Sequence, residues 1–95
     1  MIQTFRDKET EALFREGHGH RAWQSFERIA RKKLLMLDAA TNLHDLKAPP
    51  NSQLEALTGD RKGQHSIRIN DQYRVCFEWR DGHAYNVELV KPRGH

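Results

Sequence analysis

The sequence has little cysteine, little proline and no long apolar run. Its single cysteine, Cys76, cannot form an intrachain disulfide or a cysteine-rich zinc module. The longest apolar run, Leu34 to Leu37, is far shorter than the roughly 20 residues that a membrane-spanning helix needs. The amino end is charged from Arg6 onward and has no signal-peptide core. We therefore expect a cytoplasmic protein with no disulfide and no membrane contact.

The sequence also lacks the common phosphate-binding and hydrolase motifs. It has no P-loop, no G-x-G-x-x-G, no G-x-S-x-G and no H-E-x-x-H, which leaves the enzyme classes that use them unsupported. Its 95 residues are enough for one domain, expected to span residues 1–95, with a modest core. The net charge of +3 favours a polyanionic partner, but only weakly.

Helical signals occupy the first half of the chain, after a short expected strand at Ile2–Phe5. Asp7 is a typical helix N-cap, and Gly17 is a typical stop for a helix that ends near Glu16. A second amphipathic helix is predicted from Arg21 to about Ala40. Its apolar positions recur at steps of three and four residues: Trp23, Phe26, Ala30, Leu34 and Leu37. Pro49-Pro50 marks the crossover to the second half.

The second half predicts an antiparallel meander. Asn70-Asp71 and Asp81-Gly82 are turn signals, and either Leu54 with Ala56 or Leu57 adds a preceding strand. The alternating apolar residues are Ile67 and Ile69, then Tyr73, Val75, Phe77 and Trp79, then Tyr85, Val87 and Leu89. The predicted class is α+β, with the helices covering the apolar face of the sheet.

The opposite face of this sheet is predicted to be polar and to carry arginines. Its expected residues are Ser66, Arg68, Arg74, Cys76, Glu78, Asn86 and Glu88. A glycine-flanked basic loop with Arg61 and Lys62 leads into it, and guanidinium groups match phosphate oxygens, so this surface is suited to an RNA backbone. The spacing leaves open a solvated loop together with cross-strand ion pairs of the strand arginines with Glu78 and Glu88.

Other charged or reactive residues give weaker signals. Arg28, Arg31, Lys32 and Lys33 form a basic helical stripe that suits either nucleic acid or solvent. No carboxylate or cysteine cluster completes a metal site with His18 and His20, so we predict no metal. Alternation places His65 at the sheet edge or core boundary, and Cys76 is expected to be an inert, buried residue.

The run from Leu57 to Phe77 resembles the signature of the HigB-type toxins, the "killer protein" branch of the RelE/ParE superfamily. The resemblance extends over about Met1 to Leu89. It implies a RelE-like fold, in which two N-terminal helices pack on one face of a curved, mainly antiparallel sheet of four to five strands. It also implies a metal-independent and cofactor-free endoribonuclease that cleaves translated mRNA in the 70S ribosome. The implied partner is a HigA-like helix-turn-helix antitoxin, through which alone operator DNA is bound.

The resemblance also suggests site residues. Arg74 matches the strand arginine that contacts the scissile phosphate, and Arg61 matches a basic loop residue of the family. Glu55 and Thr58 stand where some relatives carry histidine and lysine, and a segment ending in His95 replaces their Asp-Tyr-His carboxyl end. The expected catalytic residues are therefore Arg74, Glu55 and His95, and the expected RNA-binding residues are Arg61, Lys62 and Arg68.

Two other functions stay open at this point. The chain could be a non-enzymatic inhibitor of DNA gyrase, as in the ParE branch of the superfamily, which the missing histidine and altered tail slightly favour. It could also be an attenuated toxin that acts mainly as an antitoxin-binding co-repressor. An atypical set of proton-transfer groups also predicts slow cleavage, since general acid-base catalysis usually contributes about 10² to 10⁴ in rate.

Overall fold

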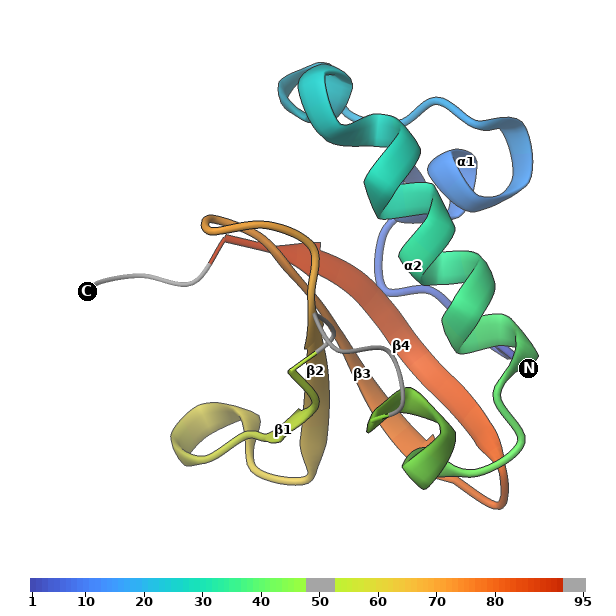
Figure 1. Cartoon of the computed structure of the whole chain (residues 1–95), viewed down its shortest axis with the longest axis vertical. Helices are drawn as coiled ribbons and strands as arrows, with labels where there is room; N and C mark the ends of the chain where they lie inside the picture. Colours follow the sequence, from blue (N-terminus) through green and yellow to red (C-terminus); the bar gives the residue numbers. More distant parts are fainter. Residues whose placement is uncertain (48–52, 92–95) are drawn as a thin grey trace.

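A four-stranded antiparallel sheet forms the framework of the protein, in the strand order β1-β2-β3-β4 (Figure 1). The computed structural model describes residues 1–47 and 53–91. The strands are β1 (Glu55–Ala56), β2 (Gln64–Arg68), β3 (Arg74–Arg80) and β4 (His83–Val90). No helix in the described ranges is long and apolar enough to span a bilayer. The meander and the added strand before it are confirmed.

The first helix, α1 (Lys8–Glu16), begins and ends where the sequence predicts. The Asp7 carboxylate accepts a hydrogen bond of 2.6 Å from the backbone N–H of Thr10, which caps the free amino end of the helix. Gly17 follows with φ of 88° and donates its N–H to the Leu13 carbonyl. This left-handed conformation is accessible to glycine at little cost and explains the stop.

The second helix is shorter than the predicted Arg21–Ala40. The structure divides it into a 3-10 helix, η1 (Arg21–Phe26), and the α-helix α2 (Glu27–Ala39). Phe26 leaves helical geometry at φ −131° and ψ 17°, and its ring packs 4.8 Å from that of Tyr73. The expectation of one continuous helix was wrong because packing of Phe26 against Tyr73, in the turn between β2 and β3, overrides the helical periodicity at this end.

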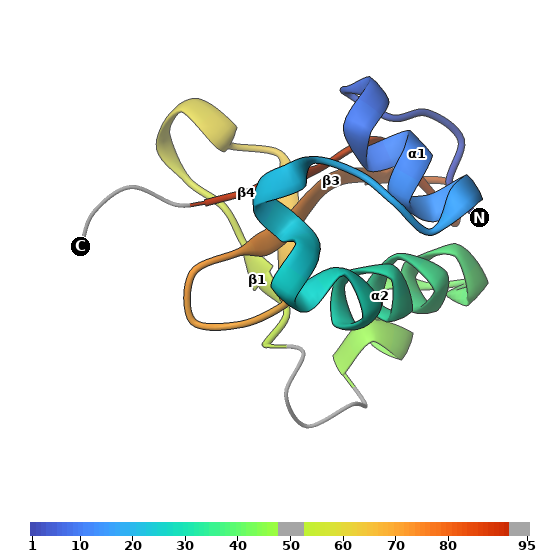
Figure 2. The ribbon, with the colours of Figure 1, turned by 90° about the horizontal axis from the view of Figure 1, so that it is seen from above.

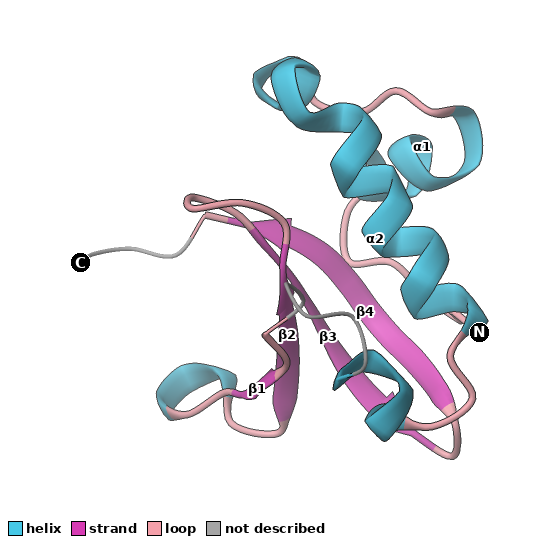
Figure 3. Ribbon diagram, in the orientation of Figure 1, coloured by secondary structure: helices cyan, strands magenta, loops and turns pink. Residues whose placement is uncertain are grey.

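Both helices cover one face of the sheet, and the short helix η3 (Gly59–Arg61) lies on the other side (Figures 2 and 3). A further 3-10 helix, η2 (Leu43–Lys47), follows α2, and the Pro49-Pro50 crossover falls outside the described residues. The largest fully buried apolar side chains come from both layers: Leu13, Leu34, Leu37, Leu46, Ile67, Val75, Phe77 and Val87. The α+β architecture with helices on the apolar face is therefore confirmed.

The amino-terminal segment forms two isolated parallel bridges with β4 rather than the expected strand at Ile2–Phe5. Ile2 pairs with Ala84 and Phe5 with Val87. Between these bridges, Asn86 has φ of 53° and donates its N–H to the Thr4 hydroxyl at 2.8 Å. This irregularity interrupts the ladder, which explains why no continuous edge strand forms.

The same irregularity changes which residues of β4 face the helices. The pairing register shifts between Cys76 and Glu78, so that Ala84 is fully buried while Tyr85 lies opposite Glu78 on the polar face. The Arg80 guanidinium packs 4.1 Å from the centre of the Tyr85 ring on that face. The prediction that Tyr85 joins the apolar set was wrong, because a β-bulge reverses the alternation.

Candidate functional site

The candidate site lies on the sheet face opposite the helices. Cross-strand pairing aligns one row of side chains, Glu55, Ser66, Cys76 and Glu88, and places Arg68 opposite Arg74 in the next row. The neighbours Ile67 and Val75 are fully buried against the helices, so the two arginines project from the other face, as predicted. Like charges directly opposite one another repel, so each arginine needs its own anionic partner.

Arg74 is held on one side by three groups. Its Nε donates to the Ser66 hydroxyl at 2.7 Å, and its Nη2 donates to the Gln53 carbonyl at 2.6 Å. Nη2 also lies 3.1 Å from Oε1 of Glu55, whose side chain is 61% exposed compared with 16% for Arg74. The strand arginines were expected to pair with Glu78, Glu88 or an incoming phosphate. Glu55 takes that role because β1 lies beside β2 and long side chains reach across two strands.

Arg61 forms a second centre on the same face. Its Nη1 donates to Oε2 of Glu88 at 3.0 Å and to Oε1 of Gln64 at 3.1 Å. Arg6 adds a weaker contact to the same Glu88 oxygen at 3.6 Å. The hydrogen bond to Glu88 raises the pKa of Arg61, because it stabilises the charged guanidinium. Because the Arg61 side chain is still 38% exposed, a phosphate can reach it from solvent.

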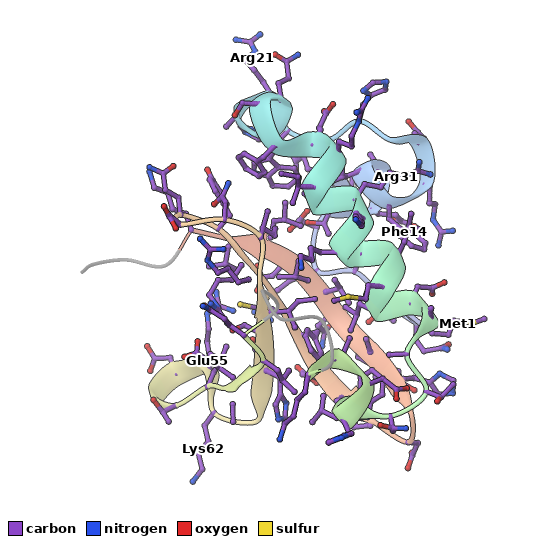
Figure 4. The ribbon with its side chains drawn as sticks, in the orientation of Figure 1. Met1, Phe14, Arg21, Arg31, Glu55 and Lys62 are labelled. Atoms are coloured by element: carbon purple, nitrogen blue, oxygen red, sulfur yellow. The ribbon has the colours of Figure 1, made fainter. Side chains whose placement is uncertain are left out.

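The other predicted RNA-binding residues are Arg68, which lies opposite Arg74, and Lys62, which lies at the margin of the site. Arg68 forms an ion pair with Asp71, in the turn between β2 and β3. Lys62 is exposed, and its side chain points away from the sheet, while Glu55 lies on β1 above it (Figure 4). His95 lies outside the described residues. The structure therefore brings Arg74 and Glu55 into contact, places Arg61 and Arg68 on the same surface, and leaves Lys62 at its rim.

The remaining predicted residues behave as structural groups. Burial raises the pKa of the Cys76 thiol, and this effect outweighs the opposing influence of Arg61 and Arg74. The residue is only 3% exposed, which confirms the prediction of a buried cysteine. His65 stacks on Phe77 with ring centres 6.2 Å apart, which confirms its place at the core boundary.

Two hollows of the surface lie away from Arg61 and Arg74. One, of about 360 Å³, lies between η2 and the β1–β2 strands beside His65. The other, of about 440 Å³, lies beside Gly17 and the basic stripe of α2, where Nε of Arg31 donates to the Phe14 carbonyl. In the described ranges, no three histidine, cysteine, aspartate or glutamate side chains gather as metal ligands. His18 instead lies 3.4 Å from Glu27.

Sequence reasoning missed the groups that hold Arg74 in place. The sequence places Ser66 on the polar face but does not predict its hydrogen bond to Arg74. Gln53 contributes a backbone carbonyl, which no side-chain pattern can reveal. The chemistry of the assembled groups is nevertheless clear. A guanidinium beside an exposed carboxylate can bind a phosphate and provide a proton acceptor next to it.

Comparisons with known proteins match nearly the whole chain to one family. Residues 3–91 match a family model described as the RelE-like toxin of type II toxin-antitoxin system HigB. The chain is 42% identical over 90 residues to Toxin HigB-1 of Vibrio cholerae serotype O1, which covers 94% of the chain and 95% of that relative. It is 34% identical over 87 residues to Endoribonuclease HigB of Proteus vulgaris, which covers 90% and 91%. A match of 31% over 86 residues links it to an uncharacterized protein of Haemophilus influenzae.

Proposed function

The chain belongs to the HigB family of RelE-like toxins of type II toxin-antitoxin systems, and we propose that it is a ribosome-dependent endoribonuclease that cleaves translated mRNA. The name of the Proteus vulgaris relative supports RNA cleavage within the family. The observation that carries the proposal for this chain is the contact of Arg74 with Glu55, on the face opposite the helices. In this proposal Arg74 binds the phosphate, and Glu55 beside it accepts a proton.

The proposed reaction uses the 2′-hydroxyl of RNA as its nucleophile and needs no metal or cofactor. The 2′-oxygen attacks the adjacent phosphorus, the bond to the 5′-oxygen breaks, and the products are a 2′,3′-cyclic phosphate and a 5′-hydroxyl. Arg74 stabilises the negative charge that develops on the phosphate oxygens. Glu55 accepts the proton of the 2′-hydroxyl, and His95 is the candidate that returns a proton to the leaving oxygen.

Entry of the phosphate requires a change at Arg74. In the free protein the Glu55 carboxylate lies on Nη2, so the incoming phosphate binds along the Nη1 edge of the guanidinium and displaces this carboxylate, because the two anions repel each other. The displaced carboxylate is largely exposed and stays within reach of the substrate, where it is free to act as a base. Arg61, Arg68 and the outward-pointing Lys62 then bind neighbouring phosphates or ribosomal RNA.

We infer dependence on the ribosome from the small number of candidate catalytic groups in the described part of the chain. Cleavage requires the 2′-oxygen, the phosphorus and the leaving oxygen to lie nearly in line, and alignment of reactants contributes a large part of many catalytic rates. The site has few groups that could impose this conformation on a flexible RNA. We propose that the translating ribosome holds the mRNA in the aligned form and that Arg74 and Glu55 complete the site.

We further propose that a HigA-like helix-turn-helix antitoxin neutralises the protein and that operator DNA is bound through this antitoxin alone. Membership in a type II toxin-antitoxin family supports a protein antitoxin as partner. Purification of the chain together with the product of the neighbouring reading frame would test this partner directly. A stable complex that suppresses the growth arrest caused by the free chain is the expected result.

Mapping of mRNA 5′ ends after brief induction tests the proposed activity. New ends within translated regions, absent when translation initiation is blocked beforehand, are expected. A supercoiling assay with purified gyrase tests the alternative of gyrase inhibition. Inhibition of gyrase without new mRNA ends would instead establish a ParE-like inhibitor. Antitoxin binding without growth arrest or cleavage would establish an attenuated co-repressor.

A further inference from the structure

Two polar side chains are buried in the described part of the chain, Thr10 and Ser66, and both are fully inaccessible. Their hydroxyl groups have different tasks. The Thr10 hydroxyl accepts the backbone N–H of Leu89 at 3.2 Å and thereby joins α1 to β4. The Ser66 hydroxyl accepts the Nε–H of Arg74 at 2.7 Å. One buried hydroxyl therefore accepts a hydrogen bond from the backbone, and the other accepts one from a side chain of the candidate site.

The position of Ser66 in the sheet explains its burial. It occupies β2, between its cross-strand neighbours Glu55 on β1 and Cys76 on β3. A small side chain at this point leaves room for the Arg74 side chain to lie across β2. A buried hydroxyl without a partner is costly, so the bond to Arg74 also satisfies Ser66.

The contacts of Arg74 are confined to one edge of its guanidinium. Ser66 binds Nε, and the Gln53 carbonyl and Glu55 carboxylate bind Nη2. Within residues 1–47 and 53–91, no acceptor is hydrogen-bonded to Nη1. The guanidinium is rigid and planar, so fixing Nε and Nη2 also fixes the direction in which the Nη1 donors point.

We propose that Ser66 is a positioning residue of the nuclease site: its buried hydroxyl fixes the plane of Arg74 so that the Nη1 edge faces the scissile phosphate. This inference rests on the proposed function. Ser66 does not contact substrate and acts only through Arg74. Its effect falls on the transition state, where alignment matters most, rather than on RNA binding, which other basic groups share.

Replacement of Ser66 by alanine tests the proposal in a reconstituted translation system with the full-length protein. Ser66→Ala is expected to lower kcat about 10-fold to 100-fold while KM changes less than about twofold. Ser66→Cys, of similar size but with a weakly accepting sulfur, is expected to give an intermediate kcat and guards against misfolding of the alanine variant. Thr10→Val removes the other buried hydroxyl and, when folded, is expected to keep the parent kcat.

A double-substitution cycle separates positioning from general damage to the fold. Lysine at position 74 has no Nε–H, so Ser66→Ala is expected to change kcat less than about twofold when added to Arg74→Lys. A double variant whose kcat falls by the product of the two single reductions would overturn the proposal. Cleavage at the parent rate by Ser66→Ala, with a parent that is itself active, would also overturn it. That result would leave the proposed function intact.

A measurement on the free protein reports the contact without RNA. In the parent, the Nε proton of Arg74, observed by NMR with labelled arginine, is expected to exchange slowly with solvent. It is expected to exchange rapidly in Ser66→Ala, and equal exchange in both proteins would contradict the proposed contact. If the parent cleaves no mRNA, the proposed function is wrong. The proposed role of Ser66 in catalysis is then wrong as well, whatever exchange rates are measured.

Discussion

The two faces of the sheet differ in what holds them together. On the helix-covered face, Ile67, Val75 and Phe77 are fully buried and gain stability from removal of apolar surface from water. On the other face, Arg74 and Glu88 are mostly buried too, with 16% and 15% of their side chains exposed, but they are satisfied by specific polar partners. Residues of the same strands therefore serve stability on one face and binding chemistry on the other.

The largest expected effect falls on the apolar face. Phe77→Ala is expected to lower the free energy of unfolding by about 3 to 5 kcal/mol, because it removes a fully buried ring and leaves a cavity. Chemical denaturation followed by circular dichroism measures this loss. A loss below about 1 kcal/mol would show that the helix-covered face is not the stabilising one.

An exposed position on the polar face should show the opposite behaviour. Glu55→Gln is expected to reduce cleavage of ribosome-bound mRNA about 100-fold, because it removes the proposed base. Its free energy of unfolding should change by less than about 1 kcal/mol, since Glu55 is 61% exposed. Asp60→Asn, at an exposed carboxylate of η3, is the matched control and should leave cleavage unchanged.

Retention of full activity by Glu55→Gln would remove Glu55 from the proton-transfer step. The parallel variant His95→Ala then shows whether the tail supplies the base instead. A variant that cleaves faster than the parent would indicate that Glu55 mainly competes with phosphate for Arg74, contrary to the proposed mechanism.

The smallest expected effect concerns Cys76, which points to the polar face but is buried like a core residue. Burial raises the pKa of its thiol above the usual 9.0, so the folded protein holds this proton more tightly than the unfolded chain. Stability is therefore unaffected by this group below pH 9 and declines slightly as the pH rises above it. Denaturation curves at pH 7, 9 and 10 test this, with Cys76→Ala as the control that removes the Cys76 contribution.

Sequence patterns predicted the apolar face well because burial imposes a period of two on every strand. Ile67, Val75, Phe77 and Val87 all lie where alternation places them. Tyr85 was assigned to the wrong face because the bulge at Asn86 leaves no trace in the pattern of apolar residues. An asparagine tolerates positive φ more readily than most residues, and it was the one local signal available.

The polar face was predicted in its residues but not in its pairings. Alternation placed Arg68, Arg74 and Glu88 on one surface, which the structure confirms. It could not show that Glu55 rather than Glu78 contacts Arg74, because that depends on the docking of the two-residue strand β1. Glu78 instead accepts a hydrogen bond from Asn86. Long side chains choose partners by three-dimensional reach, which spacing along the chain does not encode.

The most direct test of the account compares Arg74→Ala with the parent in cleavage of ribosome-bound mRNA, each shown to be folded. Arg80→Ala is the control, since Arg80 lies on the same strand about 20 Å away and packs on Tyr85. Arg74→Ala is expected to lose about 10²- to 10³-fold in kcat, while Arg80→Ala keeps the parent rate. Parent-like cleavage by folded Arg74→Ala would contradict a nuclease site on this face of the sheet.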